Sequence, residues 1–372
     1  MISIIVPTYQ EVENLKPLSQ MIQIALTDAG ETAYEIIIMD DNSQDGSIEK
    51  VAELVEKHPI RIVTRTENRG LSPAVIDGFG EAKGEFVVVM DADLSHPATA
   101  IPEMVKQLRN GGSDFVLGSR YVEGGSIDES WTLWRYINSV VATIPALPIT
   151  RVKDPMSGFF AVRKADIPNA YNLSPIGYKI ALEVMVKGDF PTVSEVPIHF
   201  VDRIHGESKL TFTEQLKYLR HLRRLYQYKF QTKAEFFQFA FVGASGFIVD
   251  LAFYLILQMF GASHTVARAI SFWPAVTWNW MLNRTITFSH REKTKKSTQW
   301  GAFASSSLLG FTVNYGTYYT LTKYVPFFEE HMVLALIVGV LMGMGFNFSI
   351  SNLFIFKKLR EEVDHEKHNK KK

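Results

Sequence analysis

Short apolar runs alternate with amphipathic stretches through the first two thirds of the chain. The apolar runs predict buried strands at residues 2–6, 34–39, 60–64, 86–90 and 114–118. Between them, apolar residues recur with a helical period near residues 12–29, 47–57, 71–83 and 98–109. This alternation predicts an α/β fold, with a mostly parallel sheet and helices on both faces. Ligands of such sheets bind at the carboxyl ends of the strands.

The pattern changes near residue 232, where long apolar stretches begin. They lie near residues 236–259, 265–288, 300–322 and 332–356. Each is long enough to cross a hydrocarbon layer of about 30 Å, so we predict four transmembrane helices. The alternative is four buried helices of a large soluble domain. This alternative is disfavoured because four consecutive apolar helices, each nearly long enough to span a membrane, are hard to bury within a soluble domain.

Basic residues gather on one side of the predicted spans. The loop after the second span contains Arg291, Lys293, Lys295 and Lys296, and the tail after the fourth span is rich in lysine. The other two loops have at most one lysine each. By the positive-inside rule we expect an integral, multi-pass protein of the cell membrane, with both termini in the cytoplasm. The start, MISIIVPTYQ, has no basic region and predicts a strand and not a signal peptide.

The apolar half has the pattern of a duplicated helical hairpin. The segment GFIVD at 246–250 parallels GFTVN at 310–314, and Asn279 with Phe288 parallels Asn347 with Phe356. Polar residues occur within or near the ends of the spans, where they either serve a function or form hydrogen bonds between helices. The sequence leaves both readings open for these residues: Asp250, Asn279, Asn283 and Arg284.

Composition narrows the classes of function. The chain has 372 residues, of which 47% are hydrophobic, so a disordered protein is excluded. It has no cysteine, which excludes a disulfide scaffold, a thiolate nucleophile and a Cys-ligated metal site. Its 39 Lys and Arg balance 39 Asp and Glu, and we expect no nucleic acid partner.

The clearest chemical signal is the acidic pair Asp91 and Asp93, directly after the run FVVVM. At the end of a strand, both carboxylates can turn toward one cation. Their hard oxygens suit magnesium or manganese, which would bridge the diphosphate of a nucleotide. The alternative is a pair of loop carboxylates that cap the next helix.

The first two strands end in polar residues and lack a G-x-G-x-x-G motif, which disfavours a dinucleotide-binding dehydrogenase. Tyr9 could instead stack on a base, and Glu11 could accept hydrogen bonds from a base or ribose. Asp40 is placed to reach a ribose or a base edge. For Ser43 and Asp45, the alternative to a contact with ligand is an Asx turn or a helix N-cap.

Seven motifs resemble, in their order, the family 2 glycosyltransferases of the GT-A (Rossmann-like) fold: VPTYQE, MDDNSQDGS, NRGLSPAVIDGF, MDADLSHP, GSRYVEGG, DPMSGFFAVRK and RIHGESK. Within that family they look most like the dolichyl-phosphate (polyprenyl-phosphate) mannose synthases. The segments FVGASGF and NWMLNRTITF resemble a GtrA-type membrane domain. The resemblance predicts a cytoplasmic GT-A domain at 1–210, an amphipathic interface helix or linker at 211–232, a GtrA-like domain with four transmembrane helices at 233–358 and a charged cytoplasmic tail at 359–372.

The resemblance implies inverting, metal-dependent transfer of mannose from GDP-mannose to dolichyl or polyprenyl phosphate, giving a β-linked product. It implies that the nucleotide-sugar contacts Pro7, Tyr9, Glu11, Ile38, Asp40, Asp91, Ala92, Arg203 and Lys209. It implies that the metal, magnesium or manganese, is held by Asp91, Asp93 and Ser95. Ser95 departs from the glutamine of many relatives, and its shorter reach puts its role in doubt.

The expected catalytic residues are Asp93, Arg120 and Asp154. A lipid phosphate is largely dianionic at neutral pH, so this nucleophile needs cations to cancel its repulsion from the donor and needs no general base. By resemblance, Arg120 lies between the donor and acceptor phosphates. Asp154 would orient the acceptor, Arg120 or the metal shell, or else cap the loop before Pro155.

Two stretches are suited to the surface of a lipid bilayer. Residues 131–149 are apolar with tryptophans and an arginine at one end, and residues 217–230 form a basic amphipathic helix. The resemblance implies that Arg135 and Ser139 contact the acceptor phosphate. Two other functions remain open: a glucosyltransferase that uses UDP-glucose, and a flippase or transporter of lipid-linked sugar with a regulatory soluble half.

Overall fold

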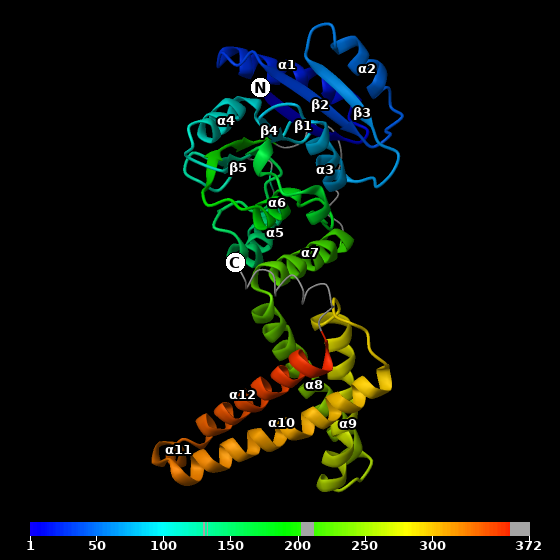
Figure 1. Ribbon diagram of the computed structural model, residues 1–372, viewed down its shortest axis with the longest axis vertical. Helices are drawn as coiled ribbons and strands as arrows, with labels where there is room; N and C mark the ends of the chain where they lie inside the picture. The colour runs from blue at the N-terminus through cyan, green and yellow to red at the C-terminus, as the bar shows by residue number, and fades with distance from the viewer. Residues whose placement is uncertain (129–130, 132, 202–211, 358–372) are drawn as a thin grey trace, which may run out of the picture. The chain divides into compact units, whose positions relative to one another are not determined.

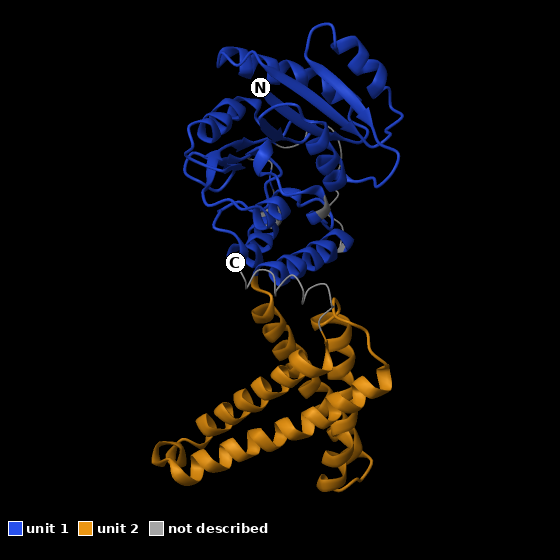
Figure 2. Cartoon of the chain, in the orientation of Figure 1, with its two compact units in different colours: residues 1–229 blue, residues 230–372 orange. Residues whose placement is uncertain are grey.

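The computed structural model describes residues 1–128, 131, 133–201 and 212–357. The chain divides into two compact units, Met1–Lys229 and Phe230–Lys372 (Figure 2). Each unit is described by itself.

The first unit is built on a twisted sheet (Figure 1). Within the described residues it has seven strands: β1 (Ile2–Thr8), β2 (Tyr34–Asp40), β3 (Ile60–Thr64), β4 (Phe86–Val89), β5 (Phe115–Ser119), β7 (Phe160–Arg163) and β8 (Val193–Pro197). Their order is β3-β2-β1-β4-β7-β5-β8. Every pairing is parallel except those of β7, which runs antiparallel to both β4 and β5.

Helices cover both faces of this sheet because its strands are apolar on both sides. One core is filled by α1 (Val12–Asp28), α2 (Ser47–Leu54) and α4 (Ile101–Arg109), which follows the short η1 (Ala98–Ala100). The other is filled by α3 (Leu71–Glu81) and α6 (Ile180–Lys187). Consecutive residues of β1 alternate between the two cores: Ile4 lies in the first and Ile5 in the second. The predicted α/β fold is confirmed.

Several elements of this unit were not predicted. They are β7, β8, α6 and a separate two-stranded pair of β6 (Ser126–Ile127) with β9 (His199–Phe200). These strands are short, and the run FAVR of β7 lies inside the motif DPMSGFFAVRK, so periodicity gives little signal.

Two amphipathic segments of the first unit are tied together by hydrogen bonds. These are α5 (Leu133–Thr143), continued by η2 (Ile144–Ile149), and the predicted basic helix, α7 (Phe212–Phe230). The Tyr218 hydroxyl donates to the Ala142 carbonyl at 2.6 Å, and Lys229 Nζ donates to the Ile149 carbonyl at 2.8 Å. Large apolar side chains of the first segment remain exposed: Ile137, Val141, Ile144 and Leu147. Contact of this surface with a bilayer stays a prediction.

The second unit is helical throughout its described part. Its helices are α8 (Thr232–Met259), α9 (His264–Leu282), α10 (Lys296–Tyr324), the short α11 (Pro326–Glu330) and α12 (Met332–Ile350). Among the described helices, two stretches are long and apolar enough to cross a membrane, Thr232–Met259 and Met332–Ile355. The four predicted segments are thus helical, and crossing by all four stays a prediction.

The duplication predicted in this unit is visible as repeated geometry. The helices α8 and α10 each carry a glycine, Gly246 and Gly310, that lies against an asparagine of the following long helix, Asn279 and Asn347. The second helix of each hairpin continues into a π-helical turn, Asn283–Thr287 or Ser351–Ile355. Glycine is required at both close contacts because a Cβ would overlap the asparagine amide.

One basic residue used for the topology prediction lies inside the helical unit. Arg291 is 5% exposed, and its Nη2 atom donates to both carboxylate oxygens of Glu235 of α8, at 2.6 and 2.7 Å. It also donates to the carbonyls of Asn352 and Phe356, both at 3.1 Å. Arg291 therefore ties the start of α8 to the end of the α12 segment.

We expect Gly246→Ala to destabilise the helical unit. The added methyl group would overlap the amide of Asn279, and overpacking of this kind costs about 1–3 kcal/mol. The melting temperature of the purified full chain in detergent should fall. Gly243→Ala is the matched control, because a Cβ at Gly243 has no heavy atom within 4 Å. Equal melting temperatures of the two variants would contradict the prediction.

Candidate active site

Sheet topology brings the polar loops of the first unit to one edge. Strands β1, β2, β4 and β5 are parallel, so their carboxyl ends lie together. Because β7 is antiparallel, its amino end lies at the same edge, and the preceding loop, residues 154–158, meets the loop after β4. A Cβ placed on Gly158 would lie 3.6 Å from both carboxylate oxygens of Asp91.

The acidic pair lies in the tight turn after β4. Asp91 has 28% of its side chain exposed, whereas Asp93 is 5% exposed. The Oδ1 atom of Asp93 accepts hydrogen bonds from the backbone N–H and the hydroxyl of Ser95, at 3.1 and 2.5 Å. Leu94, between them, has a φ of 63°, which bends the chain back on itself. Ala92, which the resemblance places at the nucleotide-sugar, lies between the two acids, and its side chain is buried.

His96, which the sequence reasoning missed, supports this turn from below. Its Nδ1 atom accepts a hydrogen bond from the backbone N–H of Asp91 at 3.0 Å. The ring is 2% exposed and stacks on Phe159 with centroids 5.0 Å apart. The only sequence signal was its place in the motif MDADLSHP. Its contacts make His96 a positioning residue for Asp91.

The acidic turn fits a hard divalent cation by the chemistry of its donors. Asp91 and Asp93 supply carboxylate oxygens, which suit magnesium or manganese. No group of three or more His, Asp or Glu side chains with metal-binding geometry occurs among the described residues. The Ser95 hydroxyl donates a hydrogen bond to Asp93. Binding of the metal by Ser95 stays a prediction.

An arginine–carboxylate pair follows β5 at the same edge. Arg120 donates to both oxygens of Asp154, from Nε and Nη2, at 2.7 Å each, and its backbone N–H donates to Oδ2 at 3.0 Å. Asp154 is fully buried, and Arg120 has 9% of its side chain exposed. Burial alone would lower the pKa of Arg120, but the hydrogen bonds and charge of Asp154 raise it. Of the roles predicted for Asp154, the structure shows contact with Arg120.

A second cation near this pair, Lys179, was also missed, because no motif of the sequence singled it out. It precedes α6, and its Nζ donates to the Met156 carbonyl at 2.7 Å. Burial lowers the pKa of Lys179 to about 8, and the positive charge of Arg120 acts in the same direction. The carboxylates of Asp154 and Asp91 oppose this shift. Charges of the arginine–carboxylate pair and of the acidic turn therefore both act on the Lys179 ammonium group.

We expect Lys179→Met to flatten the dependence of stability on alkaline pH. The lysine titrates near 10.5 when unfolded and near 8 when folded. Between these values the unfolded chain binds more protons, so the wild type gains stability as the pH rises, by about 1–3 kcal/mol. Melting temperatures at pH 8–10 would measure the difference. Lys153→Met, at an exposed lysine, is the control and should follow the wild type. Parallel curves for wild type and Lys179→Met would refute the assignment.

The nucleotide residues predicted on β1 and its loop differ in accessibility. Tyr9 is 41% exposed, and the guanidinium of Arg69 lies 5.1 Å from its ring centroid, a neighbour that the sequence did not reveal. Glu11, at the start of α1, accepts a hydrogen bond from Asn14 at 2.6 Å. Pro7 is buried within β1. Tyr9 thus offers the accessible aromatic face on this loop.

On β2, the predicted residues lie deeper. Ile38 is fully buried in the core, so its side chain presents no surface to solvent. Asp40 is 2% exposed, and its carboxylate accepts hydrogen bonds from the hydroxyl and the backbone N–H of Ser43. Asp45 accepts from the backbone N–H groups of Val12 and Ser47, each at 3.1 Å, so the Asx-turn reading holds for this residue.

The predicted acceptor residues are only partly within the described structure. The Tyr121 hydroxyl, next to Arg120 in sequence, donates to the Ser139 hydroxyl of α5 at 2.8 Å, which links the Arg120 loop to α5. Arg135 lies on α5, and its side chain is outside the described residues. Arg203 and Lys209 also lie outside the described residues. Contacts of these residues with substrate stay predictions.

Two family models match the chain. "Glycosyl transferase family 2" matches residues 3–167, and "GtrA/DPMS, transmembrane domain" matches residues 238–356. Similar curated proteins are named dolichol-phosphate mannosyltransferase. That of Pyrococcus furiosus is 37% identical, and the match covers 94% of this chain and 97% of the relative. That of Saccharomyces cerevisiae is 40% identical, over 68% of this chain and 93% of the relative.

The solved structures that this chain resembles are more distant in sequence. Glucosyl-3-phosphoglycerate synthase from Mycobacterium tuberculosis, in complex with Mn²⁺, UDP and glucosyl-3-phosphoglycerate, has a TM-score of 0.45 and 18% identity, over 62% of this chain and 80% of that chain. A mannosyltransferase from Pyrobaculum calidifontis, in complex with GDP-Man and Mn²⁺, has a TM-score of 0.41 and 14% identity, over 95% of this chain and 87% of that chain.

Proposed function

Because the chain belongs to the dolichol-phosphate mannosyltransferase family, we propose that it transfers mannose from GDP-mannose to dolichyl or another polyprenyl phosphate. One observation carries the proposal. An acidic turn suited to a metal–diphosphate and a buried, charged arginine occur at the same edge of the sheet. Binding of the nucleotide-sugar donor would use the acidic turn, and binding of an anionic acceptor would use the arginine.

The chain's own residues would act chiefly by electrostatics. A lipid phosphate is largely dianionic at neutral pH and can attack the anomeric carbon without a general base. Its approach to the donor diphosphate is opposed by repulsion between anions, and Arg120 would reduce that repulsion. Asp154 keeps the guanidinium charged and its plane oriented, through two hydrogen bonds of 2.7 Å. Direct attack of this kind inverts the anomeric carbon and gives a β-linked product.

A divalent cation is part of the proposal. Asp91 and Asp93 would hold it, and when bound it would neutralise charge on the diphosphate leaving group. His96 orients Asp91, and Ser95 orients Asp93, by the hydrogen bonds given above. This assigns the turn after β4 to donor binding and the Arg120–Asp154 pair to the space between the two substrates.

The second unit would embed the protein in a bilayer. We propose four crossings with both termini in the cytoplasm, because Lys293, Lys295 and Lys296 lie between the second and third helices. The exposed apolar side chains of α5 and η2 would meet the same membrane, where the acceptor lipid resides.

The function can be tested with the purified full chain and radiolabelled nucleotide-sugars. With GDP-mannose and polyprenyl phosphate, label should enter an organic-extractable lipid. With UDP-glucose as donor, much less label should enter. A chain that ends at Lys229, where the first unit ends, should still transfer mannose to a short-chain polyprenyl phosphate. Preference for UDP-glucose would overturn the donor assignment. Loss of transfer by a folded truncated chain would give the membrane half a part in catalysis.

A further inference from the structure

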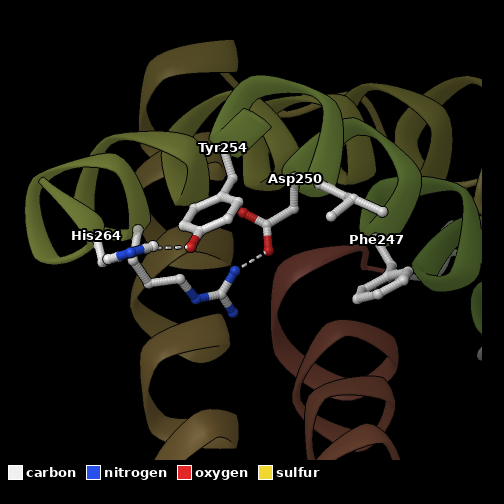
Figure 3. Close-up of a pocket in the computed structure, with 6 residues that line it drawn as sticks. Phe247, Asp250, Tyr254 and His264 are labelled. Atoms are coloured by element: carbon white, nitrogen blue, oxygen red, sulfur yellow. Dashed lines mark hydrogen bonds and ion pairs between the residues drawn. The ribbon is translucent and has the colours of Figure 1, made fainter. Parts of the chain in front are cut away.

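A pocket lined by both charged and apolar side chains opens between α8 and α9 in the helical unit (Figure 3). It has a volume of about 350 Å³ and is lined by Phe247, Asp250, Leu251, Tyr254, His264 and Arg268. Asp250 and Arg268 form an ion pair, and the Ser271 hydroxyl donates to Asp250 at 2.7 Å. The Tyr254 hydroxyl lies 2.7 Å from Nδ1 of His264. The pocket therefore combines opposite charges with hydrogen-bonding groups among apolar helices.

The duplicated hairpin shows that packing does not require these charges. Counted from the matching glycines, Asp250 corresponds to Asn314. Counted back from the matching asparagines, Ser271 corresponds to Gly339 and Arg268 to Leu336. In the second hairpin, Asn314 lies against Gly339, with a Cβ of that glycine placed 2.7 Å from Asn314 Oδ1. One copy of the hairpin thus packs through a neutral asparagine and a glycine, whereas the other carries an ion pair.

Charged side chains in apolar helices are costly and commonly mark a site. Arg268 has 65% of its side chain exposed, and among the described contacts only its Nη1 atom bonds Asp250. A guanidinium has five N–H donors, so further donors can face a ligand. The amino end of α9, four residues before Arg268, adds the positive end of a 19-residue helix. These features favour an anionic group beside Arg268.

The other lining residues indicate what accompanies that anion. The Asp250 carboxylate accepts hydrogen bonds and would repel a second negative charge. Phe247 and Leu251 are 64% and 44% exposed and offer apolar surface along α8. Arg268 lies about 6 Å along α9 from its first residue, near the amino end of that helix. A singly charged phosphodiester with hydroxyl groups and an apolar chain matches all of these features.

We infer that this pocket binds the headgroup of a phosphodiester lipid, with Arg268 against the phosphate and Asp250 against a headgroup hydroxyl. Two sources have this chemistry: a glycerophospholipid such as phosphatidylglycerol, and a polyprenol joined to a sugar by a phosphodiester. The second is the product class of the proposed function, whereas the first is independent of it. The site is distinct from the acidic turn and Arg120, which lie in the first unit.

The test is lipid binding to the full chain in detergent, measured by native mass spectrometry. The double variant Asp250→Asn with Arg268→Leu installs the residues of the second hairpin and leaves no unpaired charge. We expect it to keep the melting temperature within a few degrees and to bind phosphatidylglycerol, mannosyl phosphoryl polyprenol or both at least tenfold more weakly than the wild type. Neutral diacylglycerol should not compete with either lipid.

A matched pair of tyrosine variants sharpens the test. Tyr254→Phe should weaken binding severalfold, whereas Tyr318→Phe, at the corresponding position of α10, should not. The phosphodiester lipid that loses more affinity in the double variant identifies the source. Unchanged binding of both lipids by the folded double variant, or full competition by diacylglycerol, would overturn the inference.

Discussion

Asp93→Ala is expected to lower the kcat of mannosyl transfer by about a hundredfold to a thousandfold or more. Asp93 is one of the two carboxylates that we propose hold the metal, and removing a group that stabilises developing charge costs about 2.7–4 kcal/mol or more. The measurement is radiolabelled transfer into extractable lipid at saturating donor. Transfer should also stop in the presence of EDTA and return when magnesium or manganese is added.

Two matched variants separate chemistry from folding at this position. Asp93→Ala leaves the N–H and hydroxyl of Ser95 without their acceptor, which costs about 1–3 kcal/mol of stability. Asp93→Asn keeps an oxygen acceptor for Ser95 and loses only the charge, so it should fold normally and remain inactive. Ser95→Ala should retain much more activity than either. An active Asp93→Asn enzyme, or undiminished turnover with EDTA, would remove the metal from the mechanism.

Arg120→Lys is expected to lower kcat by about a hundredfold to a thousandfold while donor KM changes little. Lysine keeps a positive charge but cannot form the two parallel hydrogen bonds that now orient the guanidinium on Asp154. The charge would be misplaced where donor and acceptor phosphates meet in the transition state. Steady-state kinetics with each substrate varied in turn would measure the effect.

Arg120→Ala should be inactive and also less stable. It leaves the fully buried carboxylate of Asp154 without a partner, and breaking a buried pair in this way costs about 3–5 kcal/mol. Arg163→Lys is a suitable control, because Arg163 pairs with Asp114 at 3.5 Å at the opposite end of β7. It should keep normal kcat. An Arg120→Lys defect confined to donor KM would show that Arg120 only binds the nucleotide-sugar.

Local patterns were enough to predict much of the catalytic fold. The strands at 2–6, 34–39, 60–64, 86–90 and 114–118 are all present, because short apolar runs between helices are a local signal. The DAD motif was found by its position after such a run. The glycine and asparagine spacing of the membrane half likewise predicted the repeated hairpin, and each glycine lies against its asparagine.

Other parts of the site had no such signal. Periodicity did not predict β7, a short run within a motif, yet its antiparallel insertion between β4 and β5 brings residues 154–158 to the acidic turn. His96 and Lys179 are single polar residues whose roles depend on neighbours in space: the N–H of Asp91 and the carbonyl of Met156. The sequence placed Arg291 in an exposed loop, whereas in the structure its side chain is buried and forms an ion pair with Glu235.

By itself, the sequence determined which of the longer apolar segments form strands and helices, where the acidic turn lies and which half is apolar enough for a membrane. These properties depend on neighbouring residues, and the chain's own periodicity reports them. Only the tertiary structure decided that Asp154 holds Arg120, that His96 supports Asp91 and that one hairpin encloses a charged pocket where its duplicate is neutral. Such contacts join residues far apart in the chain, and strand order and helix packing decide which of them meet.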